Sequence, residues 1–397
     1  MHIVHVIKTS IGATWALRQI RELIYLGNKV DVILPEDGPI VELYREVGAK
    51  VHFAANDVAA LKNPIRLIRS AYRLRRMIGA IAPDIIHTHF VGCALMLRLA
   101  MYGDNTPRLF QVPGVLHLEN PLIKSVEIAL TTRNDFWVAS CKATREIYLR
   151  SGVKPERVGL SYYGTDLVTA DKDTPLDLRA QLGLKADTTI IGMVAYAYAP
   201  KQWLGYRRGI KGHEDLIDAA ALLRDAGWDV TIVIVGGPWG DAAPYYEQVQ
   251  AYARERLGQH AYFLGTRQDV HQIYSNFDVV AHPSHSENLG GAVESLLLGV
   301  PTVTTNVGGF PDIVLPGKTG WLVEAKNPQA LAMAIEEALV DPIQAKALAA
   351  AGRMMMIQLL DVRTTAAEIQ AIYRSLLKNK DICPASVKAT QTENCRG

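Results

Sequence analysis

Short apolar runs alternate with amphipathic stretches along most of the chain. In the first half the apolar runs have the length and composition of buried parallel strands, at 2–7, 29–34, 51–53, 84–89, 109–112, 135–139 and 158–160. Between them lie segments with helical spacing, at 14–26, 39–47, 63–81 and 94–101. This repeated strand–helix alternation predicts an α/β fold with a doubly wound parallel sheet and helices on both faces.

The same pattern restarts after a charged stretch at 172–187 that contains Pro175. The later apolar runs are predicted strands, at 189–194, 229–235, 261–264, 277–281, 302–305 and 320–323. We therefore expect one Rossmann-like domain at 1–170 and a second at 171–360. A last helix, at 361–377, is expected to return to the first domain. The polar residues 378–397 lack periodicity and are predicted to be a disordered tail.

One stretch of the second half, His282 to Pro301, combines a strand end, a glycine-rich turn and a helix start. Backbone N–H groups at such a turn favour an anion. Glu287 precedes the turn, and Glu294 is expected one to two turns into the helix. A phosphate on the N–H groups would leave Glu294 to accept from ribose hydroxyls and Glu287 to face a sugar. The alternative is an ordinary turn whose acids cap a helix.

Bulk properties narrow the class of protein. A chain of 397 residues suits two domains, and a net charge of +2 gives no reason to expect a nucleic-acid partner. The cysteines, at 93, 141, 383 and 395, have neither CxxC nor Cys/His spacing, so we expect no disulfide and no structural zinc. The first residues do not form a signal peptide, and no apolar stretch reaches membrane-spanning length. A cytoplasmic location follows as the expectation.

Residues near the carboxyl ends of the first-half strands are candidates for ligand contact. Gly12 follows the first strand, but no further glycines stand at dinucleotide-fingerprint spacing, which disfavours a nicotinamide-dependent dehydrogenase. A single glycine still permits close approach of a ligand to the backbone. His87, His89 and the loop 114–119 are expected near the same edge. We expect at most one of His87 and His89 to face a cleft, and a packed core histidine is the favoured interpretation of either.

The order of short motifs is more specific than the strand pattern. The second half contains Lys211-Gly212-His213, Val235-Gly236-Gly237, the segment 263–270, the Glu287–Glu294 segment, Gly299-Val300-Pro301, Gly308-Gly309 and 317–320. The first half contains 26–30, 83–89 and Tyr163-Gly164-Thr165-Asp166. Together they resemble the group 1 (family 4) retaining glycosyltransferases of GT-B architecture over roughly residues 1–375.

The resemblance implies two Rossmann-like domains that face a central cleft, with a nucleoside-diphosphate sugar held by the second domain and an acceptor by the first. It places Lys211 at the diphosphate, Glu294 at the ribose and Glu287 at the donor sugar. Other donor contacts are implied for the backbone of Asn288, Leu289, Gly290 and Gly291, for Thr266 and Arg267 beside the base, and for Gly12. No metal or other cofactor is required, because fixed cations and N–H donors can stabilise the leaving group. The competing interpretations are a solvated surface lysine at 211 and an Arg267 that caps its own turn.

The chain departs from the family pattern in three places. Ala195-Tyr196 stand where members commonly have Gly-Arg, and the inserted loop 197–209 offers Arg207 and Arg208 as a replacement cation. Six residues, rather than the usual seven, separate Glu287 from Glu294. His117 is the candidate for the histidine that the family often carries in a Thr-x-His-Gly loop; a structural role in the loop is the alternative.

The function that these motifs favour is transfer of a hexose, with retention, from a nucleotide sugar to a glycan, lipid-linked or small-molecule acceptor, as in polysaccharide biosynthesis. A sugar-nucleotide epimerase or a phosphorylase on the same architecture remains an alternative. A non-catalytic nucleotide-sugar-binding subunit is a third.

A basic stretch, Lys62–Arg76, adds a possible membrane contact. It carries Lys62, Arg66, Arg69, Arg73, Arg75 and Arg76, and contains no acid. Ile65, Ile68, Tyr72 and Met77 are expected to form the apolar face that packs on the sheet, with the arginines on another face. Such a helix can lie on an anionic membrane, which would make the protein peripheral at the inner membrane face. The alternative is a packed helix with a solvated basic side.

Overall fold

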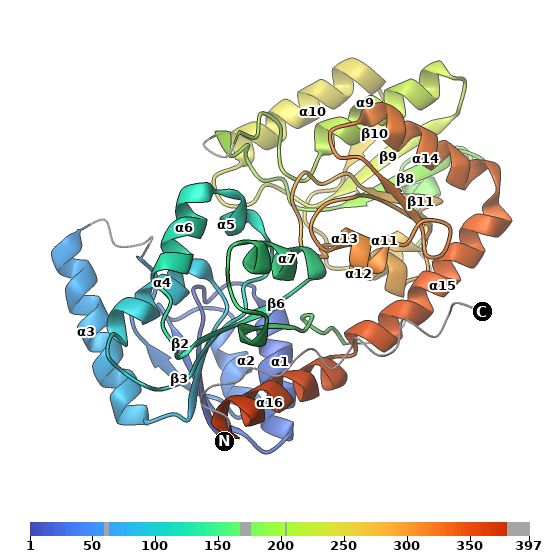
Figure 1. Cartoon of the computed structure of the whole chain (residues 1–397). Coiled ribbons are helices and arrows are strands. Elements are labelled where there is room, and N and C mark those ends of the chain that lie inside the picture. The colour runs from blue at the N-terminus through green and yellow to red at the C-terminus, as the bar shows by residue number, and fades with distance from the viewer. Residues whose placement is uncertain (59–62, 167–175, 203–204, 379–397) are drawn as a thin grey trace. The chain divides into compact units, whose positions relative to one another are not determined.

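The computed structural model describes residues 1–58, 63–166, 176–202 and 205–378 (Figure 1). The chain divides into two compact units. Unit 1 contains Met1–Asp166 and the chain from Leu359 onward, and unit 2 ends at Gln358. The predicted boundary at 170/171 lies outside the described residues. So does the predicted tail, except for Lys378, which belongs to the last helix.

Unit 1 is built on a parallel sheet of seven strands. They are β1 (His2–Val6), β2 (Lys29–Leu34), β3 (Lys50–Phe53), β4 (Ile85–Thr88), β5 (Arg108–Phe110), β6 (Asp135–Ala139) and β7 (Val158–Leu160). Their order across the sheet is β3-β2-β1-β4-β5-β6-β7. The order reverses between β1 and β4, and in sheets of this kind ligands bind at the carboxyl ends of the strands where the order reverses.

Helices cover both faces of this sheet. They are α1 (Thr14–Tyr25), α2 (Val41–Glu46), α3 (Pro64–Ile81), α4 (Val91–Ala100), α5 (Leu116–Glu119), α6 (Pro121–Ala129), α7 (Lys142–Arg150) and α16 (Val362–Lys378), with a 3₁₀ turn at Pro155–Arg157. The apolar residues of α3, α4 and α7 form one core, and those of α1, α2 and α16 pack on the opposite face. The second face is therefore completed by the last described helix of the chain.

Helix α3 begins where the sequence predicts and turns a different face inward. The Asn63 side chain caps it by accepting from the backbone N–H groups of Ile65 (2.9 Å) and Arg66 (3.3 Å). The side chains that it buries are Ala71, Leu74 and Ile78. The prediction that Ile65, Ile68 and Tyr72 pack on the sheet is wrong, because these side chains are 60%, 64% and 61% exposed. Both apolar sets recur at helical spacing, so spacing alone could not choose between them.

Unit 2 repeats the architecture with six parallel strands. They are β8 (Thr189–Val194), β9 (Val230–Val235), β10 (Ala261–Phe263), β11 (Val279–His282), β12 (Thr302–Thr305) and β13 (Trp321–Val323), in the order β10-β9-β8-β11-β12-β13. The order reverses between β8 and β11, which are hydrogen-bonded neighbours. The predicted class, two doubly wound parallel α/β units, is confirmed.

The helices of unit 2 again cover both faces. They are α8 (Leu178–Gln181), α9 (His213–Asp225), α10 (Ala243–Leu257), α11 (Val270–Tyr274), α12 (Ala292–Leu297), α13 (Phe310–Ile313), α14 (Pro328–Val340) and α15 (Pro342–Leu360). The main apolar core lies between the sheet and α9, α10 and α14 (Figure 1). A smaller core joins α8 and α11 to the other face. The ends of β8 and β11 are thereby held between two packed layers.

Candidate functional site

Lys211 lies in the loop that leads from β8 into α9, and this loop is fixed to the one that follows β11. The backbone N–H of His285 donates to the carbonyl of Ile210 at 2.8 Å. Gly212 has a φ of +74°, and a Cβ there would collide with the backbone carbonyl of Pro283. Only glycine meets both conditions, so the Lys211-Gly212 pair positions the lysine against the β11 loop.

Lys211 forms an ion pair with Glu287 at the reversal point of the sheet. Its Nζ contacts Glu287 Oε2, and the two side chains are 18% and 12% exposed. The other carboxylate oxygen accepts from the backbone N–H of Asn288 at 3.0 Å. The ring of Tyr198 lies 5.8 Å from the ammonium. A cation and a carboxylate, both largely shielded from solvent, therefore meet at the carboxyl ends of adjacent strands β8 and β11.

The turn after Glu287 is closely packed. Gly290 has a φ of +46°, and a Cβ there would approach the Glu287 carboxylate to 2.7 Å. A Cβ on Gly291 would lie 2.9 Å from the carbonyl oxygen of Val194. The backbone N–H of Gly309 donates to the Asn288 carbonyl at 2.8 Å. Leu289 is buried, so the turn is held from both sides. Its glycines are required because a larger side chain at either position would collide with neighbouring atoms.

Glu294 lies nearer the turn than predicted. Helix α12 begins at Ala292 and is six residues long, so Glu294 stands in its first turn rather than one to two turns in. Its side chain is exposed. It is close enough to Tyr274 for its charge to add to the effect of burial, which raises the pKa of that phenol well above its usual value. A short helix contributes little dipole, so positive charge at this site comes chiefly from Lys211.

Thr266 and Arg267 follow β10, beside the glycines that end β9. The backbone N–H of Gly236 donates to the carbonyl of Gly265 at 2.8 Å, and a Cβ on Gly237 would lie 3.0 Å from Thr266 Oγ1. Arg267 forms two hydrogen bonds to Asp269, at 2.8 and 2.5 Å. This arrangement fits the interpretation in which Arg267 braces its own turn. Contact of either residue with a base stays a prediction.

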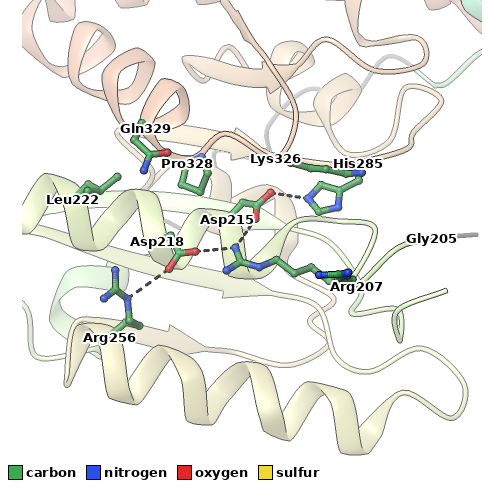
Figure 2. A pocket seen from close by; sticks show the side chains of 11 residues that line it. Gly205, Arg207, Asp215, Asp218, Leu222, Arg256, His285, Lys326, Pro328 and Gln329 are labelled. Carbon is green, nitrogen blue, oxygen red and sulfur yellow. Dashed lines mark hydrogen bonds and ion pairs between the residues drawn. The ribbon is translucent and has the colours of Figure 1, made fainter. Parts of the chain in front are cut away.

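Arg207 and Arg208 line a pocket of about 480 Å³ together with Asp215, Asp218 and Leu222 of α9 (Figure 2). Arg208 donates to Asp215 and to Asp218, both at 2.7 Å. His285 lies 2.6 Å from the other oxygen of Asp215. Burial raises the pKa of Asp215, but the hydrogen bonds from His285 and Arg208 outweigh it and hold this pKa below its ordinary value.

This pocket is distinct from the Lys211–Glu287 pair, since neither of those residues lines it. Arg208 is therefore the partner of two α9 carboxylates, a pairing that was not predicted. Whether Arg207 or Arg208 replaces the family's arginine stays a prediction.

In unit 1 the structure places Gly12 in the open and His117 in a buried network. Gly12 has a φ of +70°, is exposed at the carboxyl end of β1, and has space for a Cβ. His117 Nε2 lies 3.2 Å from the Tyr148 hydroxyl and 3.4 Å from Glu127. Glu127 is fully buried and also accepts from Trp137 Nε1 at 3.2 Å. Burial lowers the pKa of His117, although the Glu127 charge opposes this. These contacts match the structural alternative, and a catalytic role stays a prediction.

His87 and His89 are both fully buried, with ring centroids 4.2 Å apart. This burial agrees with the favoured interpretation of packed core histidines, and neither ring faces a cleft. The two rings nevertheless do not alternate between faces, because residues two apart on a strand point to the same face. His5 of β1, which the sequence did not single out, joins them with centroids at 4.9 and 5.2 Å. Its register opposite His87 required the sheet order to be known.

Comparison with known proteins bears on both units. The family model described as "Glycosyl transferases group 1" matches residues 205–355, and the model described as "Glycosyltransferase Family 4" matches residues 12–168. D-inositol 3-phosphate glycosyltransferase of Mycobacteroides abscessus is 34% identical over 286 residues, which are 69% of this chain and 58% of the relative. The enzyme of that name from Mycobacterium sp. (strain JLS) is 28% identical over 271 residues, 66% of this chain and 56% of the relative. The match thus spans little more than half of these relatives.

A solved structure, HepE of Anabaena in complex with UDP-glucose, has a TM-score of 0.76 and 24% sequence identity, and the match covers 95% of this chain and all of HepE. This likeness shows a shared fold.

Proposed function

Since the chain belongs to the group 1 glycosyltransferases, we propose that it transfers a hexose from a nucleoside-diphosphate sugar to an acceptor hydroxyl, with retention of the anomeric configuration. The acceptor is a glycan, a lipid-linked glycan or a small molecule. The observation that carries the proposal is the Lys211–Glu287 pair at the sheet reversal of unit 2. Breaking the anomeric C–O bond places negative charge on the diphosphate, and a fixed, poorly solvated cation stabilises that charge most in the transition state.

Each part of the site has a proposed role. The Lys211 ammonium binds the diphosphate and exchanges its contact with Glu287 for the phosphate oxygens. Glu287, released from that pair, accepts from hydroxyls of the donor sugar. The backbone N–H groups of 288–291 add donors to the phosphate, and Glu294 accepts from the ribose. Its position in the first turn of α12, close to the glycine turn, suits a group that binds the sugar next to the phosphates.

The remaining candidates have weaker support from the geometry. Thr266 lies beside the Gly236–Gly237 turn, where it would contact a base, and Gly12 leaves open backbone for a diphosphate. We propose that unit 1 holds the acceptor. UDP-glucose, which HepE binds, and inositol phosphate, which the name of the curated relatives contains, are the first donor and acceptor to try.

No metal or other cofactor is part of the proposal. Lys211 and the turn N–H groups supply the positive charge that a divalent cation would otherwise supply at a diphosphate. Transfer is therefore expected to proceed at an unchanged rate when a chelator is added to the assay. A rate that falls with the chelator and returns with added magnesium or manganese would contradict this part.

A screen of nucleotide sugars tests the function directly. A ligand that binds only the folded protein raises its melting temperature, and this identifies the donor without knowledge of the acceptor. The stabilising donor is then incubated with candidate acceptors, and a new glycoside is sought by mass spectrometry. An epimerised donor without glycoside would indicate an epimerase, and sugar 1-phosphate formation or use would indicate a phosphorylase. Binding without any turnover would indicate a non-catalytic subunit.

We further propose that α3 brings the protein to a membrane that carries its acceptor. Exposed Ile65, Ile68 and Tyr72 share the solvent side of this helix with exposed arginines at 66, 69, 73 and 76. Apolar side chains that enter the headgroup region and cations that attract anionic lipid are the two parts of an interfacial helix. No helix in the described part of the chain is long and apolar enough to cross a bilayer. Lys62, at the start of the predicted basic stretch, lies outside the described residues.

A further inference from the structure

Three histidines meet in the interior of unit 1, at the adjacent strands β1 and β4. His5 is on β1, its register partner His87 is on β4, and His89 follows β4 directly. All three are fully buried. One ring nitrogen of each lies within 4.8 Å of the other two. His5 Nδ1 and His89 Nε2 are 2.9 Å apart.

The hydrogen bonds around the cluster fix which nitrogens carry protons. The Tyr163 hydroxyl donates to the carbonyl of Gln111 at 2.6 Å, so it must accept at 2.8 Å from His89 Nδ1–H. His89 Nε2 then has a lone pair and accepts from His5 Nδ1–H. His5 Nε2 therefore also carries a lone pair. In the described part of the chain that nitrogen has no hydrogen-bond partner.

His87 has a second ring nitrogen of this kind. Its Nδ1 lies 2.6 Å from the Tyr373 hydroxyl, and its Nε2 is buried without a partner among the described residues. Two buried ring nitrogens without partners are unfavourable, because each has lost its hydration and gained nothing in return. A cation would take an electron pair from His87 Nε2 in the tautomer whose Nδ1–H donates to Tyr373. It would also displace the proton that His5 Nδ1 and His89 Nε2 share, and His5 would then be protonated at Nε2.

We propose that His5, His87 and His89 form a binding site for a divalent transition-metal cation of the zinc class. Three neutral imidazoles suit zinc, cobalt, nickel or copper, and they do not suit calcium or magnesium. A tetrahedral ion with bonds of about 2.0–2.1 Å separates its ligand nitrogens by about 3.3 Å. His5 Nδ1 and His89 Nε2, now 2.9 Å apart, have to separate by a few tenths of an ångström once their shared proton is displaced, and the third nitrogen has to move inward from its present separation.

The surroundings are those of a metal site. Tyr373 and Tyr163 hold the outer nitrogens of His87 and His89, as the second shell of a metal-bound histidine does. Since Tyr373 is on α16, the ion would connect β1 and β4 to the last helix of unit 1. This structural site is independent of the proposed glycosyl transfer.

The test uses the full chain without a polyhistidine tag. The protein is unfolded, freed of metal with a chelator and refolded with or without one equivalent of zinc, or of cobalt as a spectroscopic probe. After dialysis, elemental mass spectrometry should find about one metal ion per chain. The cobalt form should have the absorption spectrum of a tetrahedral site, and metal-loaded protein should melt at a higher temperature than metal-free protein.

Matched variants separate this site from incidental binding. His87→Gln should lose the metal, whereas His260→Gln, a change of a histidine in unit 2, should keep it. Tyr373→Phe leaves all three imidazoles in place and should weaken metal affinity about 10- to 100-fold. That variant keeps the proposal testable if His87→Gln does not fold. Wild-type protein that retains no metal after refolding, or Tyr373→Phe with unchanged affinity, would overturn the proposal and leave a metal-free histidine cluster.

Discussion

Lys211 and Glu287 are 76 positions apart in the chain and form an ion pair across two adjacent strand ends. The loop that carries the lysine is hydrogen-bonded to the loop that carries the carboxylate, so the pair is set by backbone as well as by charge. A diphosphate that approaches the ammonium has to compete with this carboxylate. On the proposed function, the pair would couple binding of the leaving group to release of a group that can bind the sugar.

Lys211→Ala should lower kcat far more than it weakens donor binding, because the cation acts mainly on charge that develops in the transition state. Loss of one such donor typically costs on the order of a hundredfold or more. The measurement is steady-state transfer with the donor found by the thermal screen. Lys185→Ala, at an exposed lysine of the same unit, is the control. Equal rates for Lys211→Ala and wild type would rule out this role.

Glu294→Gln should weaken donor binding with a smaller effect on kcat. A hydrogen bond to a charged group contributes about 1.5–3 kcal/mol, which corresponds to about a tenfold or larger rise in Kd. Calorimetric titration with the nucleotide sugar and with the free nucleoside diphosphate measures it. The exposed Glu324 supplies the matched control, Glu324→Gln. If both variants bind like wild type, the ribose contact lies elsewhere.

Other members of the family commonly have an arginine at the position of Tyr196, and the loop 197–209 is proposed to supply a replacement. The double variant Arg207→Ala, Arg208→Ala should therefore reduce donor affinity about tenfold. The pairing of Arg208 with Asp215 and Asp218 predicts a second effect, a lower melting temperature, because two carboxylates would lose their shared partner. Arg254→Ala removes an exposed arginine from α10 as a control. A lower melting temperature with full donor affinity would assign these arginines to structure alone.

The stability of unit 2 should fall as the pH drops below about 6.5. Burial lowers the pKa of His213 to about 4 and that of His282 to about 3, with the Lys211 charge adding to the effect on both. Since the unfolded histidine has a pKa of about 6.5, the unfolded state binds more protons between these values. The contribution of each neutral histidine is thus present above about pH 6.5 and is lost toward pH 4, at about 1.4 kcal/mol per pH unit.

Melting temperatures from about pH 7.5 to 5 measure this dependence. His213→Leu removes one titrating group and should make the slope shallower, whereas His271→Gln, outside the buried set, should leave it unchanged. An identical slope in His213→Leu would mean that carboxylates, rather than buried histidines, set the acid sensitivity.

Vesicle binding should depend on the arginines and the exposed apolar residues of α3. Replacing Arg69, Arg73 and Arg76 by Gln should reduce co-sedimentation with anionic vesicles, since each cation near the surface adds about 1 kcal/mol. Binding should also fall with salt, because the Debye length is about 8 Å at physiological ionic strength. Replacing Ile65, Ile68 and Tyr72 by Ser should weaken the part of vesicle binding that persists at high salt.

The control for α3 removes the same charge elsewhere on unit 1, at the exposed Lys142, Arg150 and Lys154. Equal losses in the two triple variants would indicate a response to net charge only. Equal binding to neutral and anionic vesicles would contradict the membrane proposal and favour the alternative, in which α3 is a packed helix whose basic side is only solvated.

The strand pattern could be predicted closely because a parallel strand buried on both faces is a continuous apolar run. The predicted strand at 135–139 coincides with β6, and Asn63-Pro64 marked the start of α3 through cap chemistry. Helix α15 was not predicted. Its alanine- and methionine-rich sequence has apolar residues around much of its circumference and therefore little periodic signal.

Pairings between distant residues could not be predicted from local pattern. The motifs proposed Lys211 and Glu287 for one site, but their direct contact depends on β8 and β11 being neighbours. The attachment of His285 to Asp215 depends on the same packing. In both cases the deciding quantity is strand order, which spacing along the chain does not encode.

The packing of α16 on unit 1 has a consequence for vectorial synthesis. The apolar core on this face of the first sheet combines Ile3, Leu23 and Ile85 with Ile369, Tyr373 and Leu376. A ribosome-bound chain that has emerged as far as Gln358 contains all of unit 2 but lacks the helix that closes unit 1. The unit whose sequence begins first is therefore completed last. Until then, the uncovered β1–β4 surface is the part of the nascent chain that most needs protection from aggregation.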